Sequence, residues 1–174
     1  MVWTLRPEIG VMVDKMVSTI YQRSILPAEE REVARMRIAQ LNACSACAEF
    51  RAPSVIASGV DEELYLHVDQ AADWPGYTTR QRLAVEFAER FAGDHRAIDE
   101  DLFARLRASF SDPEVLDLTM FVAVCLGLGR ALEVLGIDES CPIDIRRFPT
   151  LAAGRSKCPS HRYLSCDIQR SWPR

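Results

Sequence analysis

The sequence predicts an all-α domain, a helical bundle. Apolar residues recur at helical spacing in several segments, helix-capping signals separate these segments, and no segment shows the alternation of a β-strand. The 174 residues are enough for one domain with a sizeable core. A composition of 48% hydrophobic and 26% charged residues is typical of a globular protein.

The first half of the chain predicts three helices. The first covers residues 8–22, and the second begins at Pro27, whose missing N–H costs nothing in a first turn. Asn42 and Ala43 form a tight connection to a third helix that runs toward Gly59. Pro53 is expected to kink that helix or to end it early. The apolar positions of the second helix are Val33, Met36, Ile38 and Leu41.

The second half predicts three further helices and one short one. Asp61 caps a short helix to about residue 70, a turn follows at residues 74–76, and Thr78 or Thr79 caps a helix that ends near Gly93. Another helix covers residues 99–110. Ser111 and Glu114 have capping-box spacing and start a last helix, which Gly136 ends. That helix is apolar nearly all round at residues 118–129, which predicts burial on every side, partly by another subunit.

Charge and targeting signals limit the possible partners. A net charge of −4 argues against general nucleic-acid binding. No signal peptide is visible, and the apolar run 118–129 is too short to span a bilayer, so we expect a cytoplasmic protein without a membrane partner. The helical domain is expected over residues 1–148. Residues 149–174 are basic and lack apolar periodicity, which predicts a flexible tail.

Cys44 and Cys47 form a Cys-x-x-Cys pair where the third helix begins. Thiols at this spacing can close and reopen a disulfide, and the field at a helix N-terminus favours a thiolate on Cys44. The pair could instead be half of a zinc site or two buried small residues. A structural zinc site usually needs four ligands, and the sequence contains no second Cys-x-x-Cys. The pair therefore favours redox chemistry.

At these residues the chain resembles the alkylhydroperoxidase D and carboxymuconolactone decarboxylase family. Glu32 precedes Cys44 by the twelve residues typical of that family, and the run from Arg37 to Cys44 is similar. The resemblance extends through Gly59-Val60, residues 83–88 and residues 110–119, and covers about residues 25–137.

The resemblance implies a helical bundle that forms trimers or hexamers and reduces organic hydroperoxides. Cys47 would attack the peroxide, Cys44 would resolve the intermediate and face the reductant, and Glu32 would belong to a proton relay. The reductant would be a dithiol carrier of the lipoyl or thioredoxin-like kind. The resemblance implies no metal and no organic cofactor.

Arg51 occupies the position of the family's histidine. Arginine stays charged and cannot act as a base near pH 7, although it can stabilise a thiolate on Cys47. Peroxidase activity is therefore expected to be weakened. Across an antiparallel hairpin of the second and third helices, Arg51 could also form an ion pair with Glu32.

Two alternatives to the peroxidase remain. One is a lyase or isomerase resembling the decarboxylase branch, and the other is a non-enzymatic oligomer that senses oxidants through Cys44 and Cys47. His67 or His95 could supply an imidazole from elsewhere in the fold, whereas Cys125 is expected to be an inert buried residue. Cys158, His161 and Cys166 could bind a metal only loosely.

Overall fold

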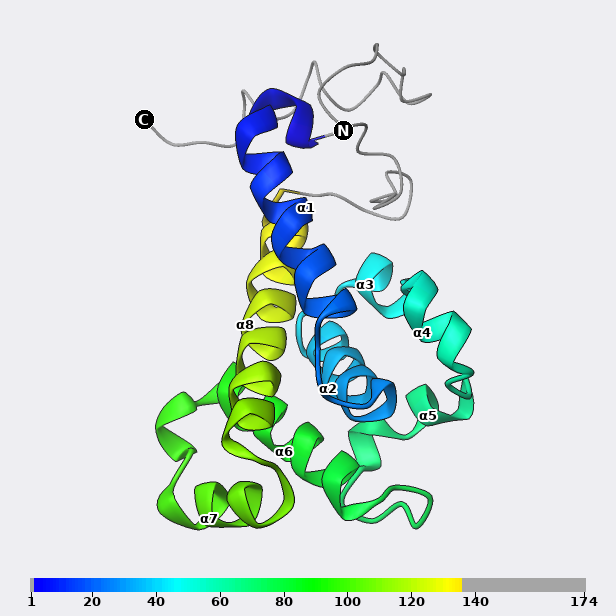
Figure 1. Ribbon diagram of the computed structural model, residues 1–174, viewed down its shortest axis with the longest axis vertical. Coiled ribbons are helices and arrows are strands. Elements are labelled where there is room, and N and C mark those ends of the chain that lie inside the picture. Colours follow the sequence, from blue (N-terminus) through cyan, green and yellow to red (C-terminus); the bar gives the residue numbers. More distant parts are fainter. Residues whose placement is uncertain (1, 136–174) are drawn as a thin grey trace.

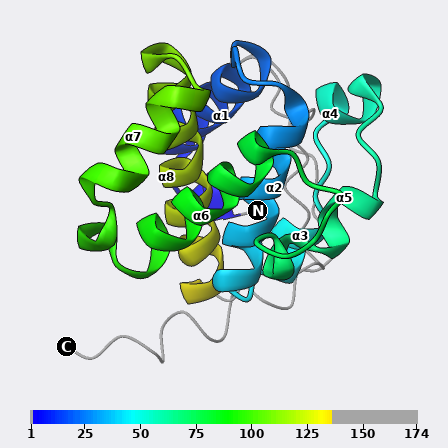
Figure 2. The ribbon, with the colours of Figure 1, turned by 90° about the horizontal axis from the view of Figure 1, so that it is seen from below.

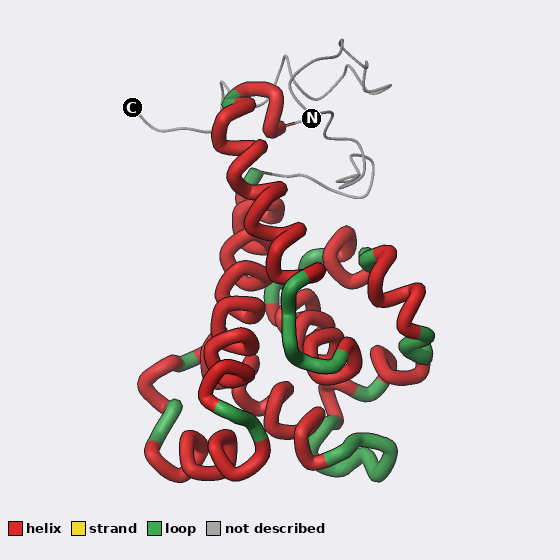
Figure 3. The backbone as a smooth tube through the Cα atoms, in the orientation of Figure 1, coloured by secondary structure: helices red, strands yellow, loops and turns green. Residues whose placement is uncertain are grey.

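The computed structural model describes residues 2–135, and every regular element in that range is a helix (Figure 3), which confirms the predicted all-α class. The elements are η1 (Val2–Leu5), α1 (Pro7–Gln22), α2 (Ala28–Leu41), α3 (Ser45–Glu49), α4 (Pro53–Ser58), α5 (Glu63–Leu66), η2 (Val68–Gln70), α6 (Thr79–Gly93), η3 (His95–Ala97), α7 (Glu100–Ser109) and α8 (Asp112–Val134). The predicted tail, the boundary at residue 148 and the predicted stop at Gly136 lie outside the described residues.

Helix α2 is the centre of the bundle. It packs most extensively against α6 and next against α8. Helices α1 and α8 lie side by side in opposite directions, and their upper ends project beyond the other helices (Figure 1). Seen from below, α7 lies on one side of α2 and α6, and the short helices α3 to α5 lie on the other (Figure 2).

Local capping signals explain the helix ends that the sequence predicted. Thr78 and Gln81 form a reciprocal capping box at the start of α6. Ser111 and Glu114 form a second one at the start of α8. Gly59 ends α4 in the left-handed conformation, with φ of 75°. Pro27, by contrast, is the residue before α2 and not part of its first turn.

The predicted third helix is two short helices. Helix α3 ends at Glu49, and Ala52 takes an extended conformation with φ of −65° and ψ of 142°. The residue before a proline disfavours the helical region, so the chain leaves one helix before Pro53 and starts another with it. Of the two outcomes expected at Pro53, early termination is the one observed.

Within one copy of the chain, α8 is buried on one side only, so the burial on every side predicted for residues 118–129, partly by another subunit, stays a prediction. Leu116 is 63% exposed and Met120 is 47% exposed, whereas Leu118 and Val122 are buried. By length and composition alone, α8 is the one helix of residues 2–135 that could cross a membrane. A core helix of a soluble protein meets the same criterion, so this property assigns α8 to neither class.

Charged side chains of α2 enter the core. Glu30, Arg31, Glu32 and Arg35 are each at most 7% exposed. Each has a partner: for example, Glu30 pairs with Arg80 at 3.0 Å, and Arg31 donates to the last carbonyls of α1. Burying an unpaired charge is costly, so these contacts specify how α2 sits among its neighbours. Leu41, predicted to be apolar core, is exposed instead.

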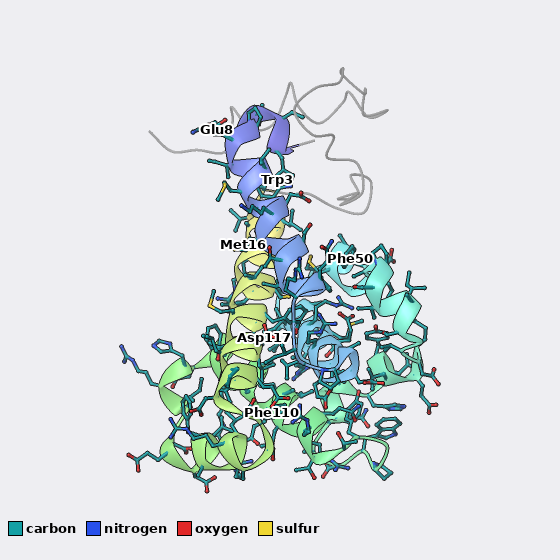
Figure 4. The ribbon with its side chains drawn as sticks, in the orientation of Figure 1. Trp3, Glu8, Met16, Phe50, Phe110 and Asp117 are labelled. Carbon is teal, nitrogen blue, oxygen red and sulfur yellow. A yellow bond between two sulfur atoms is a disulfide. The ribbon has the colours of Figure 1, made fainter. Side chains whose placement is uncertain are left out.

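Asp117 connects α8 to the loop between α1 and α2 (Figure 4). Its Oδ2 accepts hydrogen bonds from the Ser24 hydroxyl at 2.7 Å and from the Ile25 N–H at 2.8 Å. These bonds satisfy backbone and side-chain donors in a segment without regular structure. They fix the start of α2 relative to α8.

Glu114 should make stability depend on pH. Hydrogen bonds from Arg80 and from Ser111 lower the pKa of Glu114 to about 2, well below its ordinary value of 4.5. A lowered folded-state pKa stabilises the protein fully above the unfolded value, and the contribution is lost as pH falls from about 4.5 toward 2. We expect Glu114→Gln to cost about 1 kcal/mol of unfolding free energy at pH 7.

Urea unfolding at a series of pH values measures this effect. The deficit of Glu114→Gln should shrink through acid pH and vanish near pH 2. Glu133→Gln, at an exposed position of the same helix, is the control and should match the native chain throughout. A Glu114→Gln deficit that does not change with pH would contradict the assignment.

Candidate functional site

Cys44 and Cys47 lie where the chain passes from α2 into α3. Ala43 has a φ of 53°, a left-handed conformation that reverses the chain. Cys44 then caps α3, and its Sγ accepts a hydrogen bond from the Cys47 N–H at 3.3 Å. The two cysteines form a disulfide, with their Cα atoms 5.2 Å apart. The predicted pairing of these cysteines at a helix start is therefore observed.

The two sulfur-bearing residues differ in access to solvent. Cys44 is 1% exposed, whereas Cys47 is half-buried. The resemblance implied that Cys44 faces the reductant, but in the described chain a thiol approaching from solvent meets Cys47. Helix α3 also has only five residues, so the field at Cys44 is weaker than a long helix would give.

A buried polar cluster of Glu32, Arg35 and Tyr65 lies beside the cysteine pair. Oε2 of Glu32 accepts from Arg35 Nε at 2.8 Å and from the Tyr65 hydroxyl at 3.1 Å. Arg35 also donates through Nη1 to the backbone carbonyl of Cys47. Glu32 is therefore linked to the cysteine segment through Arg35.

Two atoms of this cluster have no hydrogen-bond partner among residues 2–135. Oε1 of Glu32 and Nη2 of Arg35 are both buried and unpaired, although Glu32 is only 1% exposed and Arg35 only 4%. Buried polar atoms of native proteins are usually paired, and exceptions are common where a group does chemistry. Glu32 thus keeps one oxygen that the fold does not use.

The electrostatics keep both neighbours of Glu32 protonated. Burial is the largest single influence on Arg35 and opposes its charge, but the charge and hydrogen bond of Glu32, together with smaller contributions from other groups, outweigh burial and raise the pKa of Arg35 above its ordinary value. Burial, together with the negative charge of Glu32, raises the pKa of Tyr65 above its ordinary value of 10. Arg35 is therefore a fixed cation and Tyr65 a fixed hydrogen-bond donor toward the same carboxylate.

The ion-pair partner of Arg51 in the described chain is Glu62, not Glu32. Its guanidinium forms a bidentate ion pair with Glu62, at 2.9 and 2.8 Å, and donates to the backbone carbonyl of Ala48 at 2.6 Å. It also lies over the ring of Tyr65, 3.8 Å from the centroid. The expected ion pair between Arg51 and Glu32 is wrong, because Arg35 and Glu62 are the partners that these two residues have.

Within residues 2–135, His67, His95 and the free cysteine Cys125 lie outside this cluster. His67 stacks on Trp74 with centroids 4.2 Å apart, and His95 lies exposed in η3. Burial raises the pKa of Cys125 to about 12, which fits the inert thiol predicted for this position. Among residues 2–135, no three His, Cys, Asp or Glu side chains could hold a metal. The loose site suggested by Cys158, His161 and Cys166 lies outside the described residues.

Gly129 of α8 allows close contact with the cysteine segment. A Cβ at this position would lie 2.5 Å from Asn42 Nδ2 and 3.6 Å from Cys47 Sγ. Asn42 is held there because its Nδ2 donates to the Leu126 carbonyl at 3.2 Å and its Oδ1 accepts from Arg130 at 3.2 Å. The turn before Cys44 is therefore fastened to α8.

We expect Gly129→Ala to destabilise the protein, because the new methyl group displaces Asn42 from its hydrogen bonds. The loss should be about 1–3 kcal/mol of unfolding free energy. Gly127→Ala on the same helix meets nothing within 4 Å and should stabilise by up to about 1 kcal/mol. Urea unfolding compares the two variants, and equal effects would contradict the close packing at Gly129.

Known proteins similar to this chain include a sequence relative and a solved structure of similar fold. No protein-family model matches the chain. The uncharacterized protein YnjA of Escherichia coli (strain K12) is 29% identical over 126 residues, which cover 70% of this chain and 68% of YnjA. The crystal structure of a protein of unknown function from Agrobacterium tumefaciens, described as a candidate antioxidant defence protein AhpD, matches with a TM-score of 0.65. That match covers 76% of this chain and 90% of the other at 21% identity.

The structural match shows the fold, and the cysteine pair lies within that fold at the start of α3. The chain therefore has the alkylhydroperoxidase D-like fold that its sequence resemblance implied.

Proposed function

We propose that the protein is a thiol-dependent peroxidase or disulfide reductase that acts on organic hydroperoxides through Cys44 and Cys47. The observation that supports this most is the disulfide of a half-buried and a buried cysteine, next to a carboxylate with an unused oxygen. The fold and its likeness to a candidate antioxidant defence protein add support. A thiol-reducing compartment, the cytoplasm, is part of this proposal.

The oxidative half of the cycle begins with the Cys47 thiol. Glu32 takes the thiol proton, the thiolate attacks the terminal peroxide oxygen, and the O–O bond breaks as an S–O bond forms. The leaving alkoxide takes a proton and departs as an alcohol, which leaves a sulfenic acid on Cys47. The Cys44 thiol then attacks that sulfur and releases water as the disulfide closes. The hydroperoxide is reduced by two electrons, and the thiol pair is oxidised by two.

The reductive half starts at the accessible sulfur. A thiolate of a dithiol carrier attacks Cys47, the S–S bond breaks, and Cys44 leaves as a thiol after it takes a proton. The carrier's second thiol then releases Cys47 and becomes part of the carrier's own disulfide. The half-buried position of Cys47 supports this order of attack.

A peroxide-consumption assay tests the proposal. Purified protein is given cumene hydroperoxide with dihydrolipoamide, reduced thioredoxin or dithiothreitol, beside the Cys44→Ser, Cys47→Ser and Cys125→Ser variants. Turnover should disappear in the first two variants and survive in Cys125→Ser, because that thiol lies outside the pair. A single stoichiometric oxidation without turnover would instead support an oxidant sensor. No thiol oxidation at all would contradict both functions and leave the lyase.

A homo-oligomer is the second part of the proposal. Large apolar side chains are exposed along the adjacent helices α1 and α8, including Met16 (Figure 4). They are Leu5 at the end of η1, Ile9, Met12 and Met16 on α1, and Leu116, Met120 and Val134 on α8. A surface of this kind is typical of subunit interfaces. The trimer or hexamer implied by the resemblance would cover it with other copies of the chain.

Light scattering at micromolar concentration is expected to give a mass that is a multiple of 19.6 kDa. Met120→Lys should lower that mass, because a charge would be buried in the interface. Arg107→Glu, at an exposed position of α7, is the control. A native chain that remains at 19.6 kDa would contradict the oligomer.

A further inference from the structure

Arg51 lies against the ring of one tyrosine and is held there by contacts with other residues. Its guanidinium lies 3.8 Å from the centroid of the Tyr65 ring, and its planar fork is held by both oxygens of Glu62. A third contact, to the Ala48 carbonyl at 2.6 Å, fixes it to the end of α3. The cation therefore covers one face of Tyr65 and restricts the movement of that ring.

Tyr65 in turn holds the carboxylate of the site. It is 5% exposed, and its hydroxyl donates to Oε2 of Glu32 at 3.1 Å. Tyr65 belongs to α5, which has only four residues and little support of its own. The clamp formed by Arg51 and Glu62 supplies a restraint that a helix this short lacks.

We infer that Arg51 and Glu62 are positioning residues that hold Tyr65, and that the Tyr65 hydroxyl controls the pH at which Glu32 takes a proton. The inference rests on the proposed function, because it assigns Glu32 the proton transfer of the cysteine pair. It gives a role to the arginine that replaces the family's histidine: Arg51 acts on the site through Tyr65 and Glu32, not by facing a cysteine.

Four groups on four helices surround or influence Glu32 electrostatically. Arg35 of α2 and Tyr65 of α5 donate to the same oxygen. Burial and, to a smaller extent, the charge of Glu32 raise the pKa of Tyr21 of α1 and of Cys125 of α8, so both stay neutral beside the carboxylate. Arg35 is a permanent cation, so Tyr65 is the neutral donor whose removal changes the environment of Glu32 without changing any charge.

The chain offers a matched control for Tyr65. Tyr77 is also buried, at 3% exposed, and its hydroxyl donates to the backbone carbonyl of Leu64 in the same helix α5. Tyr77→Phe and Tyr65→Phe therefore each remove one buried hydroxyl that serves α5. Only Tyr65→Phe removes a donor to Glu32.

The experiment follows the side-chain carboxyl carbon of Glu32 by NMR across pH, in the full-length protein labelled with ¹³C-glutamate. The Glu32→Gln variant identifies the signal. Loss of a hydrogen bond to the ionised form favours the neutral form, so Tyr65→Phe should move the midpoint to higher pH by about one unit. Tyr77→Phe should leave it in place, although both variants lose comparable stability to urea.

Arg51→Lys tests the positioning step, because lysine keeps the charge but loses the fork and the planar stacking surface. It should move the Glu32 midpoint in the same direction as Tyr65→Phe and by less. On the Tyr65→Phe background, Arg51→Lys should add no further shift. The dependence of disulfide reduction by dithiothreitol on pH should move in parallel with the NMR midpoint.

Two results would overturn the inference. One is a Glu32 midpoint that Tyr65→Phe leaves unchanged or moves no more than Tyr77→Phe does. The other is an Arg51→Lys shift that is fully additive to that of Tyr65→Phe, which would mean that Arg51 acts on Glu32 directly. Neither the NMR midpoint nor disulfide reduction uses peroxide. A native chain that fails to consume hydroperoxide would therefore contradict the proposed function, while these two measurements would still test the roles of Arg51 and Tyr65.

Discussion

Replacing Arg35 with methionine is expected to lower the free energy of unfolding by about 3–5 kcal/mol at pH 7. Glu32 and Arg35 are 1% and 4% exposed, so removing the cation leaves a carboxylate buried without its counter-charge. The variant also loses the contact to the Cys47 carbonyl, which holds the cysteine segment against α2. Urea unfolding of the native chain and the variant measures the difference.

Arg37→Met is the matched control, because Arg37 lies on the same helix and also pairs with a glutamate. That pair is more exposed, with side-chain exposures of 20% for Arg37 and 40% for Glu89, so its loss should cost less than about 1 kcal/mol. The double variant Glu32→Leu/Arg35→Met should recover much of the stability, since an apolar pair replaces the ions. Equal losses for Arg35→Met and Arg37→Met would show that Glu32 does not depend on Arg35.

The sequence predicted those parts of the fold that short-range chemistry determines. The starts of α6 and α8 depend on a capping residue and a partner three positions later, so both could be identified from neighbouring residues. The exposed face of α8, which carries Leu116 and Met120, could not be identified, because the apolar run 118–129 has no polar side to mark it. Which face of an apolar helix is covered depends on how distant segments pack.

In the candidate site, too, the features set by neighbouring residues could be predicted and those set by distant contacts could not. Cys44 and Cys47 could be found because their spacing within one turn carries the chemistry. Arg35 gave a weaker signal, an i to i+3 spacing from Glu32 that is common on helix surfaces. Tyr65 gave no sequence signal, because 33 residues separate it from Glu32 and the four residues of α5 are too few to show a helical pattern.

The predicted ion pair of Arg51 and Glu32 failed because it was estimated from positions along two helices. The estimate used depth along two antiparallel helices and so assumed that the helix after Cys44 continues past Arg51. The chain leaves the helix at Phe50, and Arg51 lies in the extended link before α4. Phe50 itself packs against Tyr21 of α1, with ring centroids 6.0 Å apart (Figure 4). Arg51 consequently reaches Glu62, a partner that the hairpin geometry did not include.

Outside the cysteine pair, the largest effect on activity is expected from Glu32→Gln. If Glu32 accepts the Cys47 proton, glutamine removes the base and keeps the shape, and hydroperoxide turnover should fall by about 10²–10⁴-fold. The substitution also leaves Arg35 buried opposite a neutral amide, so circular dichroism must first show that the variant is folded at the assay temperature. Steady-state consumption of cumene hydroperoxide with a saturating dithiol then gives the ratio of turnover rates.

Glu30→Gln is the control variant, because it removes a buried ion pair without removing the proposed base, Glu32. Glu30 lies on the same helix, is 7% exposed and, like Glu32, has one buried oxygen without a hydrogen-bond partner among the described residues, but its ion pair is with Arg80 at 3.0 Å. It should lose stability as Glu32→Gln does and keep turnover within about threefold of the native chain, a change of less than about 1 kcal/mol in activation free energy. If both variants turned over alike, the carboxylate of Glu32 would have no part in moving the proton. The unpaired Oε1 would then reflect packing alone.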